Sequence, residues 1–234
     1  MSEMTDREQI AYLNSDACTL AEADKSALLW KLTVSDAELA AYVKALTLEA
    51  QSFNSAKAAA SGWMYEVGAG SAKQENSYYC VPASLQNAMY LDSKGYGKTQ
   101  AYWAGKLGTT TTGSGFSRVV DIVNDTTYVT RTWNFAVRSI GQGVTPLTSS
   151  NIKGCFVATL STGKPVFVST KNMLVNGGHC VLVDAIDSSQ TLVRVVDPYR
   201  PLYNSNYSVK VNYNVSTLWS YISSHPDGLG SIAW

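Results

Sequence analysis

Residues 74–87 read QENSYYCVPASLQN, and this stretch organises the rest of the chain. It places Gln74 six positions before Cys80, which is followed by Pro82 and by a helix-like run over residues 83–91. A cysteine at the start of a helix has its thiolate favoured by the positive end of the helix dipole. A glutamine amide just upstream can donate a hydrogen bond to an oxyanion. The stretch therefore predicts the nucleophile of a thiol-hydrolase active site.

Two polar residues complete this pattern about a hundred residues later. His179 follows two glycines and leads into an apolar run, and Asp197 lies between a second apolar run and a proline. Thiol hydrolysis needs a thiolate, a proton carrier for the leaving group and donors for the oxyanion. We expect Cys80 to attack the carbonyl carbon, His179 to pair with the thiolate and protonate the leaving amine, and Asp197 to orient the imidazole. Gln74 and the backbone N–H of Cys80 are the expected oxyanion donors.

The order Gln-x5-Cys, Gly-His before an apolar strand, and Asp-Pro resembles a branch of the papain-like cysteine peptidases. The branch is the bacteriocin-processing (double-glycine) one, and in particular its stand-alone relatives without a transporter. The resemblance covers residues 72–234 and implies an α+β papain-like fold, with the cysteine on a helix facing a histidine on an antiparallel sheet. These relatives usually have glycine after the cysteine, where this chain has Val81. A valine does not readily adopt the positive φ that a glycine can.

Nearby residues offer alternatives for some of these roles. Asn76 and Gln86 also lie close to the cysteine in sequence, so the choice of the oxyanion donor is not unique. His225 lies in the turn-like sequence SHPDG and is a poorer candidate for the base than His179. Cys180 directly follows that histidine and must face the other side of a strand, which predicts a core residue.

The composition excludes several classes of function. The chain has 234 residues, of which 45% are hydrophobic and 15% charged, with a net charge of +0, so nothing suggests nucleic acid or an anionic membrane as a partner. No apolar run approaches the ~18 residues needed to span a bilayer. No Gly-x4-Gly-Lys-Ser/Thr phosphate loop is present. The expected partner is a peptide or protein substrate, and the oligomeric state stays open.

The localisation is inferred from the surface chemistry. A low charge content with 14 tyrosines is common in exported bacterial proteins, whereas the polar N-terminus has no signal peptide. We therefore expect an extracellular protein from which a signal has been removed, with a cytoplasmic protein as the alternative.

The cysteines predict neither a metal nor a cofactor. Their spacings fit no zinc pattern, and there are only two histidines. If Cys80 is a free thiol, at most one disulfide can form among Cys18, Cys155 and Cys180. The alternative is that these three cysteines form no disulfide and serve as small buried hydrophobic residues.

The chain divides into a helical N-terminal extension, residues 1–71, and a catalytic domain, residues 72–234. A capping box at Ser35 and Glu38 predicts a helix that runs for most of residues 35–61, before a flexible GAGSA connection. Its apolar stripe must bury against something, so the extension is a permanent part of the core, a removable pro-segment or a partner-binding element. The stripe consists of Leu39, Tyr42, Val43, Leu46, Ala50 and Phe53.

The catalytic region reads as helices followed by strands, the order of an α+β domain. The expected helices are residues 100–107, 117–124, 149–160 and 215–222, and the expected strands are residues 128–133, 165–169, 180–186, 192–196, 209–213 and 230–234. Cleft loops that set specificity are expected at residues 108–115 and 172–177.

These observations favour a cysteine peptidase or amide hydrolase. The same thioester chemistry serves an acyltransferase or transpeptidase. A papain-like domain without turnover, used as a binding module, is the alternative from another class.

Overall fold

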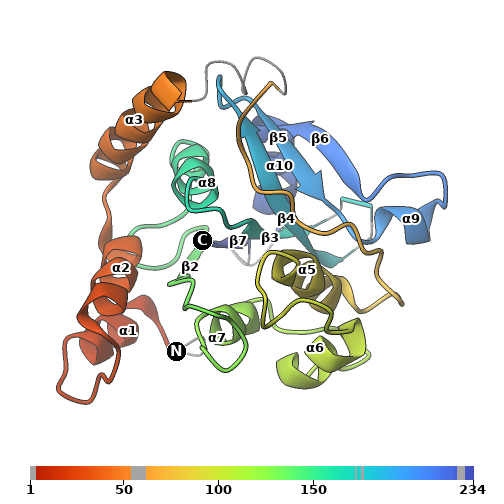
Figure 1. Cartoon of the computed structure of the whole chain (residues 1–234), viewed down its shortest axis with the longest axis horizontal. Helices are drawn as coiled ribbons and strands as arrows, with labels where there is room; N and C mark the ends of the chain where they lie inside the picture. Colours follow the sequence, from red (N-terminus) through yellow and green to blue (C-terminus); the bar gives the residue numbers. More distant parts are fainter. Residues whose placement is uncertain (1–3, 54–61, 172, 175–176, 226–229) are drawn as a thin grey trace.

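The computed structural model describes residues 4–53, 62–171, 173–174, 177–225 and 230–234 (Figure 1). Helices pack on both faces of one antiparallel sheet. The helices of these residues are α1 (Asp6–Leu13), α2 (Glu22–Thr33), α3 (Asp36–Phe53), α5 (Cys80–Met89), α6 (Gln100–Leu107), α7 (Arg118–Val123), α8 (Ile152–Leu160), α9 (Arg200–Tyr203) and α10 (Val215–Ser223). The strands are β1 (Trp63–Glu66), β2 (Val137–Ser139), β3 (Val166–Lys171), β4 (Gly178–Asp187), β5 (Leu192–Val196), β6 (Lys210–Asn214) and β7 (Ser231–Ala233).

The sheet is organised around β4, its longest strand. The strand order is β2-β7-β3-β4-β5-β6, and β1 pairs with the far end of β4. All these pairs are antiparallel. The start of β4 lies opposite the end of β3, with Thr170 facing His179 and Ser169 facing Cys180. The predicted histidine therefore lies at the end of the sheet where β4 starts and β3 finishes.

The two faces of the sheet form separate cores because successive side chains of a strand point to opposite sides. Val166 and Val168 pack in a core with residues of α3, α8 and α10, whereas Phe167 packs with residues of α5, α6 and α7. The second group of helices lies together in the lower part of Figure 1. The predicted cysteine helix thus covers one face of the strand that carries the predicted histidine.

The N-terminal helices are packed onto this body. The predicted capping box is present, since Ser35 Oγ and Glu38 Oε2 are 2.7 Å apart and Glu38 N donates to Ser35 Oγ at 3.3 Å. In α3, Leu39 and Val43 are buried in the core of the sheet, and a Cβ on Gly154 of α8 would lie 2.8 Å from Leu39 Cγ. Tyr42, predicted on the buried stripe, is 41% exposed. The predicted continuation over residues 54–61 lies outside the described residues.

One predicted strand is wrong. Residues 128–133 form turns and irregular backbone, because nearby carboxylates and carbonyls take up their N–H groups. Asp92 Oδ2 accepts from Thr130 N at 3.0 Å, and the Asp125 carbonyl accepts from Tyr128 N at 2.9 Å. The other predicted helices and strands of the catalytic region are present. Four short elements were not predicted: α1, β1, β2 and α9.

No helix in the described part of the chain has the length and apolar character required to cross a membrane.

Candidate active site

Cys80 is the first residue of α5, as the sequence predicts. The first N–H groups of a helix have no partner within the helix, so they and the helix dipole favour a negative charge there. The helix is fixed against the sheet by Ser84, whose Oγ donates to the carbonyl of Cys180 at 3.0 Å. This contact lies one residue from His179, so it sets the distance between the helix start and the predicted base.

His179 and Asp197 form a buried hydrogen-bonded pair. Their strands, β4 and β5, are paired with Leu182 opposite Val196, which brings the residue after β5 beside the start of β4. His179 Nε2 lies 2.7 Å from Asp197 Oδ1, and the two residues are 4% and 0% exposed. The N–H of Tyr199 donates to the same Oδ1 at 3.0 Å. Asp197 therefore fixes the orientation of the imidazole.

The imidazole of His179 also acts on the thiol of Cys80 and shifts its pKa. Because Nε2 faces Asp197, Nδ1 is the nitrogen left for the sulfur. Burial acts to raise the pKa of the Cys80 thiol, but the hydrogen bond and charge of His179 and the N–H groups of Cys180 and Val81 outweigh it and lower that pKa. Burial acts to lower the pKa of His179, yet its bonds to Asp197 and Cys80 raise it to about 9. Between these two pKa values the pair is a thiolate and an imidazolium.

Gln74 is buried beside the turn that carries Asp197. It is 1% exposed, and its backbone N–H donates to the carbonyl of Pro198 at 2.9 Å. Its Nε2 donates to the carbonyl of Asn76 at 2.7 Å, which leaves the second amide hydrogen for another acceptor. Among the described residues Oε1 has no partner.

The two alternative amides have other contacts. Asn76 Oδ1 accepts from the N–H of Tyr78 at 3.1 Å in a local turn. Gln86 Nε2 donates to the carbonyl of Lys98 at 3.0 Å, and Gln86 Oε1 accepts from Gln100 at 3.0 Å. Gln86 thus faces the start of α6.

A family comparison adds to this geometry. A family model described as the Peptidase_C39 like family matches residues 70–225. The chain belongs to this family. The match supports cysteine peptidase activity and spans Gln74, Cys80, His179 and Asp197, and together with the mixed sheet-and-helix architecture it confirms the papain-like α+β fold. No curated protein matches the chain.

In this C39-like chain, two side chains that the sequence did not single out hold the segment that carries Gln74. Gln100 Oε1 accepts from Glu75 N at 2.9 Å and its Nε2 donates to the carbonyl of Lys73 at 2.8 Å, so it bonds to the backbone on both sides of Gln74. Asn87 of α5 exchanges two hydrogen bonds with the backbone of Ala72, at 2.7 and 2.9 Å.

The preceding GAGSA stretch, residues 68–72, is therefore not the flexible connection that its composition suggests. Gly70 N donates to the carbonyl of Asn87 at 2.8 Å, and a Cβ on Gly70 would lie 2.9 Å from Asn87 Oδ1. The glycine allows a close approach to α5 rather than free motion.

Val81 causes no strain after the cysteine. Positive φ among the described non-glycine residues occurs only at Asn134 and Gln190. Val81 lies inside the first turn of α5 and is 4% exposed in the core formed with α6 and α7. Val81 therefore fits in the place of the glycine as a buried residue of the helix.

Two of the other cysteines, Cys155 and Cys180, are buried and unsuited to nucleophilic chemistry. All four cysteines are free thiols. Burial raises the pKa of Cys180 well above its ordinary value, and burial raises the pKa of Cys155 to about 12. Cys180 faces the core, as predicted. Within the described residues no cluster of His, Cys, Asp and Glu could hold a metal ion.

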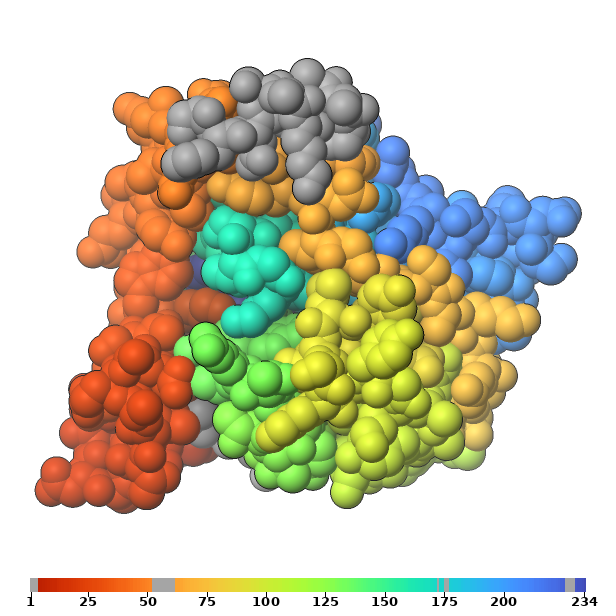
Figure 2. Space-filling view, in the orientation of Figure 1, coloured from red at the N-terminus to blue at the C-terminus, as the bar shows by residue number. Residues whose placement is uncertain are grey.

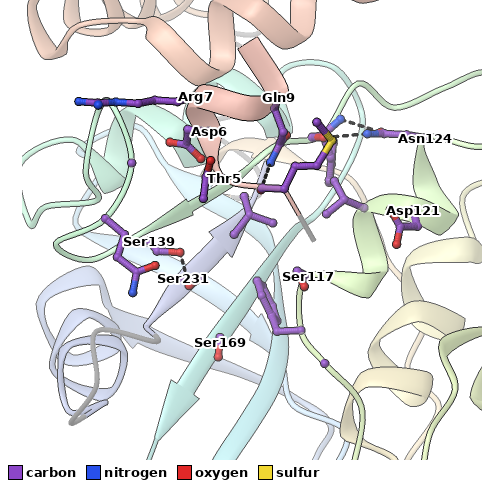
Figure 3. A pocket seen from close by; sticks show the side chains of 18 of the residues that line it. Thr5, Asp6, Arg7, Gln9, Ser117, Asp121, Asn124, Ser139, Ser169 and Ser231 are labelled. Atoms are coloured by element: carbon purple, nitrogen blue, oxygen red, sulfur yellow. Dashed lines mark hydrogen bonds between the residues drawn. The ribbon is translucent and has the colours of Figure 1, made fainter. Parts of the chain in front are cut away.

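A cavity of about 940 Å³ opens between α1, α7 and the strands β2, β7 and β3 (Figure 3), and the described residues that line it do not include Gln74, Cys80, His179 or Asp197. Its floor includes Ser139, Ser231 and Ser169, which lie opposite one another on β2, β7 and β3. The start of α1 forms one wall, and the segment from Gly115 through α7 forms another. The predicted cleft loop over residues 108–115 thus reaches the cavity at its last residue, whereas residues 172, 175 and 176 of the second loop lie outside the described residues.

His225 lies between the cavity and the start of β4. Its Nε2 lies 3.4 Å from Ser169 Oγ, and its ring lies 3.8 Å from the position of a Cβ on Gly178, the neighbour of His179. The sequence had set this histidine aside as part of a turn. The structure places it in the wall of the cavity.

Proposed function

We propose that this chain is a cysteine peptidase or amide hydrolase that acts through Cys80, His179 and Asp197. One observation carries the proposal: a buried histidine is bonded to a carboxylate at 2.7 Å, and the same histidine lowers the pKa of a thiol at the start of a helix. The arrangement lowers the pKa of the thiol and raises that of the imidazole, as nucleophilic thiol chemistry requires.

The first half of the reaction forms a thioester. The Cys80 thiolate attacks the carbonyl carbon of the substrate, and the carbonyl oxygen becomes an oxyanion. The free hydrogen of Gln74 Nε2 and the backbone N–H of Cys80 donate to this oxyanion. The imidazolium of His179 gives its proton to the leaving amine as the carbon–nitrogen bond breaks, while Asp197 keeps the ring in place.

The second half releases the acid product. Neutral His179 accepts a proton from a water molecule, and the resulting hydroxide attacks the thioester carbonyl. The same donors stabilise the second oxyanion. Collapse of this intermediate breaks the carbon–sulfur bond and restores the thiolate and the imidazolium.

The cavity between α1, α7 and the sheet receives a part of the substrate away from the scissile bond. Ser169 and His225 in its lining lie beside Cys180 and Gly178, the two neighbours of His179, and a concave pocket is the usual location of a substrate. Because α1 forms one wall, the N-terminal extension contributes to the substrate site.

The test combines a thiol-reactive fluorescent probe with a peptide library read by mass spectrometry. The parent protein is expected to label at neutral pH and to cleave peptides, and Cys80→Ala to do neither. A thiol of ordinary reactivity with no cleavage supports a binding module instead. Products extended by an added amine such as glycinamide indicate acyl transfer from the same thioester.

A further inference from the structure

A row of tyrosines leads away from the catalytic histidine. The ring of Tyr199 lies 6.0 Å from the ring of His179, measured between centroids. Tyr203 lies 6.4 Å from Tyr199, and Tyr207 lies 6.4 Å from Tyr203. The mechanism uses none of these rings beyond the contact with His179, so the outer part of the row needs another explanation.

The outer part of this tyrosine row is open to solvent. Tyr203 and Tyr207 are 57% and 40% exposed, and the neighbouring Leu202 is 44% exposed. In Figures 1 and 2 the segment around α9, coloured blue, projects from the body of the molecule. A group of large apolar side chains on a projection beside a catalytic pair is typical of an interaction site.

The row is held in shape by Arg200. The guanidinium lies 4.9 Å from the centroid of the Tyr207 ring, and Nε donates to the carbonyl of Ser208 at 2.9 Å. The N–H of Tyr203 donates to the carbonyl of Tyr199 at 2.9 Å. A preorganised aromatic surface loses little conformational entropy on binding. Less of the favourable free energy from burying its apolar area is therefore offset, and the affinity is higher than for a flexible surface.

We propose that the tyrosine row binds an extended segment of a peptide substrate, with apolar or prolyl side chains at alternate positions. The proposal rests on the proposed function only in taking the bound peptide to be the substrate. Because the row begins at His179, the segment lies on one side of the scissile bond.

The spacing of the rings matches a peptide. Side chains two residues apart in an extended strand point the same way and are separated by ~6.6 Å. Each step of 6.4 Å in the row therefore corresponds to two residues. Proline-rich segments commonly dock against aromatic-lined grooves.

The orientation and charge of the row favour a peptide over a glycan strand. The interplanar angles along the row are 71°, 45° and 25°, so the rings do not form a flat platform for stacked sugars. The charged side chain beside the outer rings, Arg200, is already engaged with Tyr207, with Ser208 and, at 3.5 Å, with the hydroxyl of Tyr213. The row therefore selects apolar rather than charged side chains.

The kinetic test uses the full chain and peptides of two lengths cut at the same bond, chosen from the library cleavage data. The long peptide extends six residues toward the row and the short one extends two. Tyr203→Ala and Tyr207→Ala are each expected to lower the ratio of kcat/KM between long and short peptides at least 10-fold. The matched control is Tyr96→Ala, since Tyr96 is 60% exposed and pairs with Tyr90 on another part of the surface. An unchanged ratio in both row variants overturns the proposal.

A binding test separates this proposal from the hydrolase assignment. Fluorescein-labelled octapeptides of alternating Leu-Ser, alternating Glu-Ser and oligoproline are titrated into the Cys80→Ala protein and read by fluorescence anisotropy. The leucine or proline peptide is expected to bind and to lose at least 10-fold in affinity with Tyr203→Ala and Tyr207→Ala combined. Tyrosine-dependent binding without cleavage by the parent keeps the row and rejects the hydrolase. Binding of none of these peptides, or tyrosine-dependent binding of chitohexaose alone, overturns the row proposal.

Discussion

Replacing Asp197 with asparagine tests the electrostatics of the site directly. Asparagine keeps the size of the side chain and an oxygen that accepts from His179 Nε2, but it removes the negative charge. The bond to Asp197 is the largest of the effects that raise the pKa of His179, and burial opposes it. Without the charge, burial prevails and the pKa of His179 falls.

The expected size of the change follows from the pKa of His179 itself. An imidazole with an ordinary pKa of 6.5 that titrates at about 9 has its charged form stabilised by on the order of 3 kcal/mol, at 1.36 kcal/mol per pH unit. In Asp197→Asn we expect the pKa of His179 to fall by more than ~1 pH unit, since the charge of Asp197 supplies much of this stabilisation. The pKa of Cys80 rises at the same time, because its thiolate loses part of its cationic partner. The pH range in which Cys80 is a thiolate and His179 an imidazolium therefore becomes narrower, because its lower limit rises and its upper limit falls.

NMR titration of the histidine rings measures the upper limit of this range. The chain has only two histidines, so His225 serves as an internal reference for His179. The pH dependence of alkylation by iodoacetamide, after subtraction of the rate in Cys80→Ala, measures the lower limit. Asp16→Asn, an exposed carboxylate between α1 and α2, is the control for loss of one charge.

Two results would refute the reasoning. A parent protein in which His179 titrates near 6.5 has no stabilised imidazolium. An Asp197→Asn variant with the same two limits as the parent shows that Asp197 acts only as a turn residue.

Three further changes probe the nucleophile, the oxyanion donor and the N-terminal packing. Cys80→Ala is expected to abolish turnover with an unchanged melting temperature, and full activity on any hydrolysed peptide rejects the nucleophile. Gln74→Ala is expected to lower kcat by roughly 10²–10³ with little change in KM; an unchanged kcat assigns the role to Asn76, to Gln86 or to backbone groups alone. Leu39→Ala is expected to reduce the free energy of unfolding by about 2–5 kcal/mol, because Leu39 is 1% exposed and packs on α8. Leu48→Ala on the same helix, where the side chain is 58% exposed, is expected to change it by less than ~0.5 kcal/mol in a denaturant titration, and equal effects contradict the packing.

The candidate catalytic residues could be proposed from the sequence because each of them carries a local signal. Cys80 precedes a proline and a helical run, His179 enters an apolar strand, and Asp197 ends another. Local signals of this kind identify the element that carries a residue. They do not give the pairing of β4 with β5, which is what brings His179 and Asp197 to 2.7 Å.

The hydrogen bonds by which Gln100 and Asn87 hold the segment around Gln74 have no such local signal in the sequence. Gln100 bonds to backbone 25 and 27 residues away, and Asn87 to backbone 15 residues away. A buried glutamine at the start of a helix looks the same in sequence as a solvated one. The serine floor of the cavity depends on the register between β2, β7 and β3, and two of these strands have only three residues each. Alternation over three residues carries too little information to predict either the strand or its register.

Two helices of the N-terminal extension, α3 and α1, make different contacts with the rest of the chain. These contacts bear on the three roles predicted for the extension: a part of the core, a removable pro-segment or a partner-binding element. The buried side chains of α3, Leu39 and Val43, belong to the same core as β3 and β4, and each contributes about 1.5–3 kcal/mol by burial. Since a domain of this size is stable by only ~5–15 kcal/mol, removal of α3 threatens the sheet that carries His179. The core role therefore fits α3. The start of α1 instead borders the cavity over β2, β7 and β3, and it is attached there by Asp6, whose Oδ2 accepts from Val144 N at 3.1 Å. If the cavity receives substrate, as we propose, stability and substrate selection depend on separate helices of the same extension, and a change confined to α1 is expected to alter the second without the first.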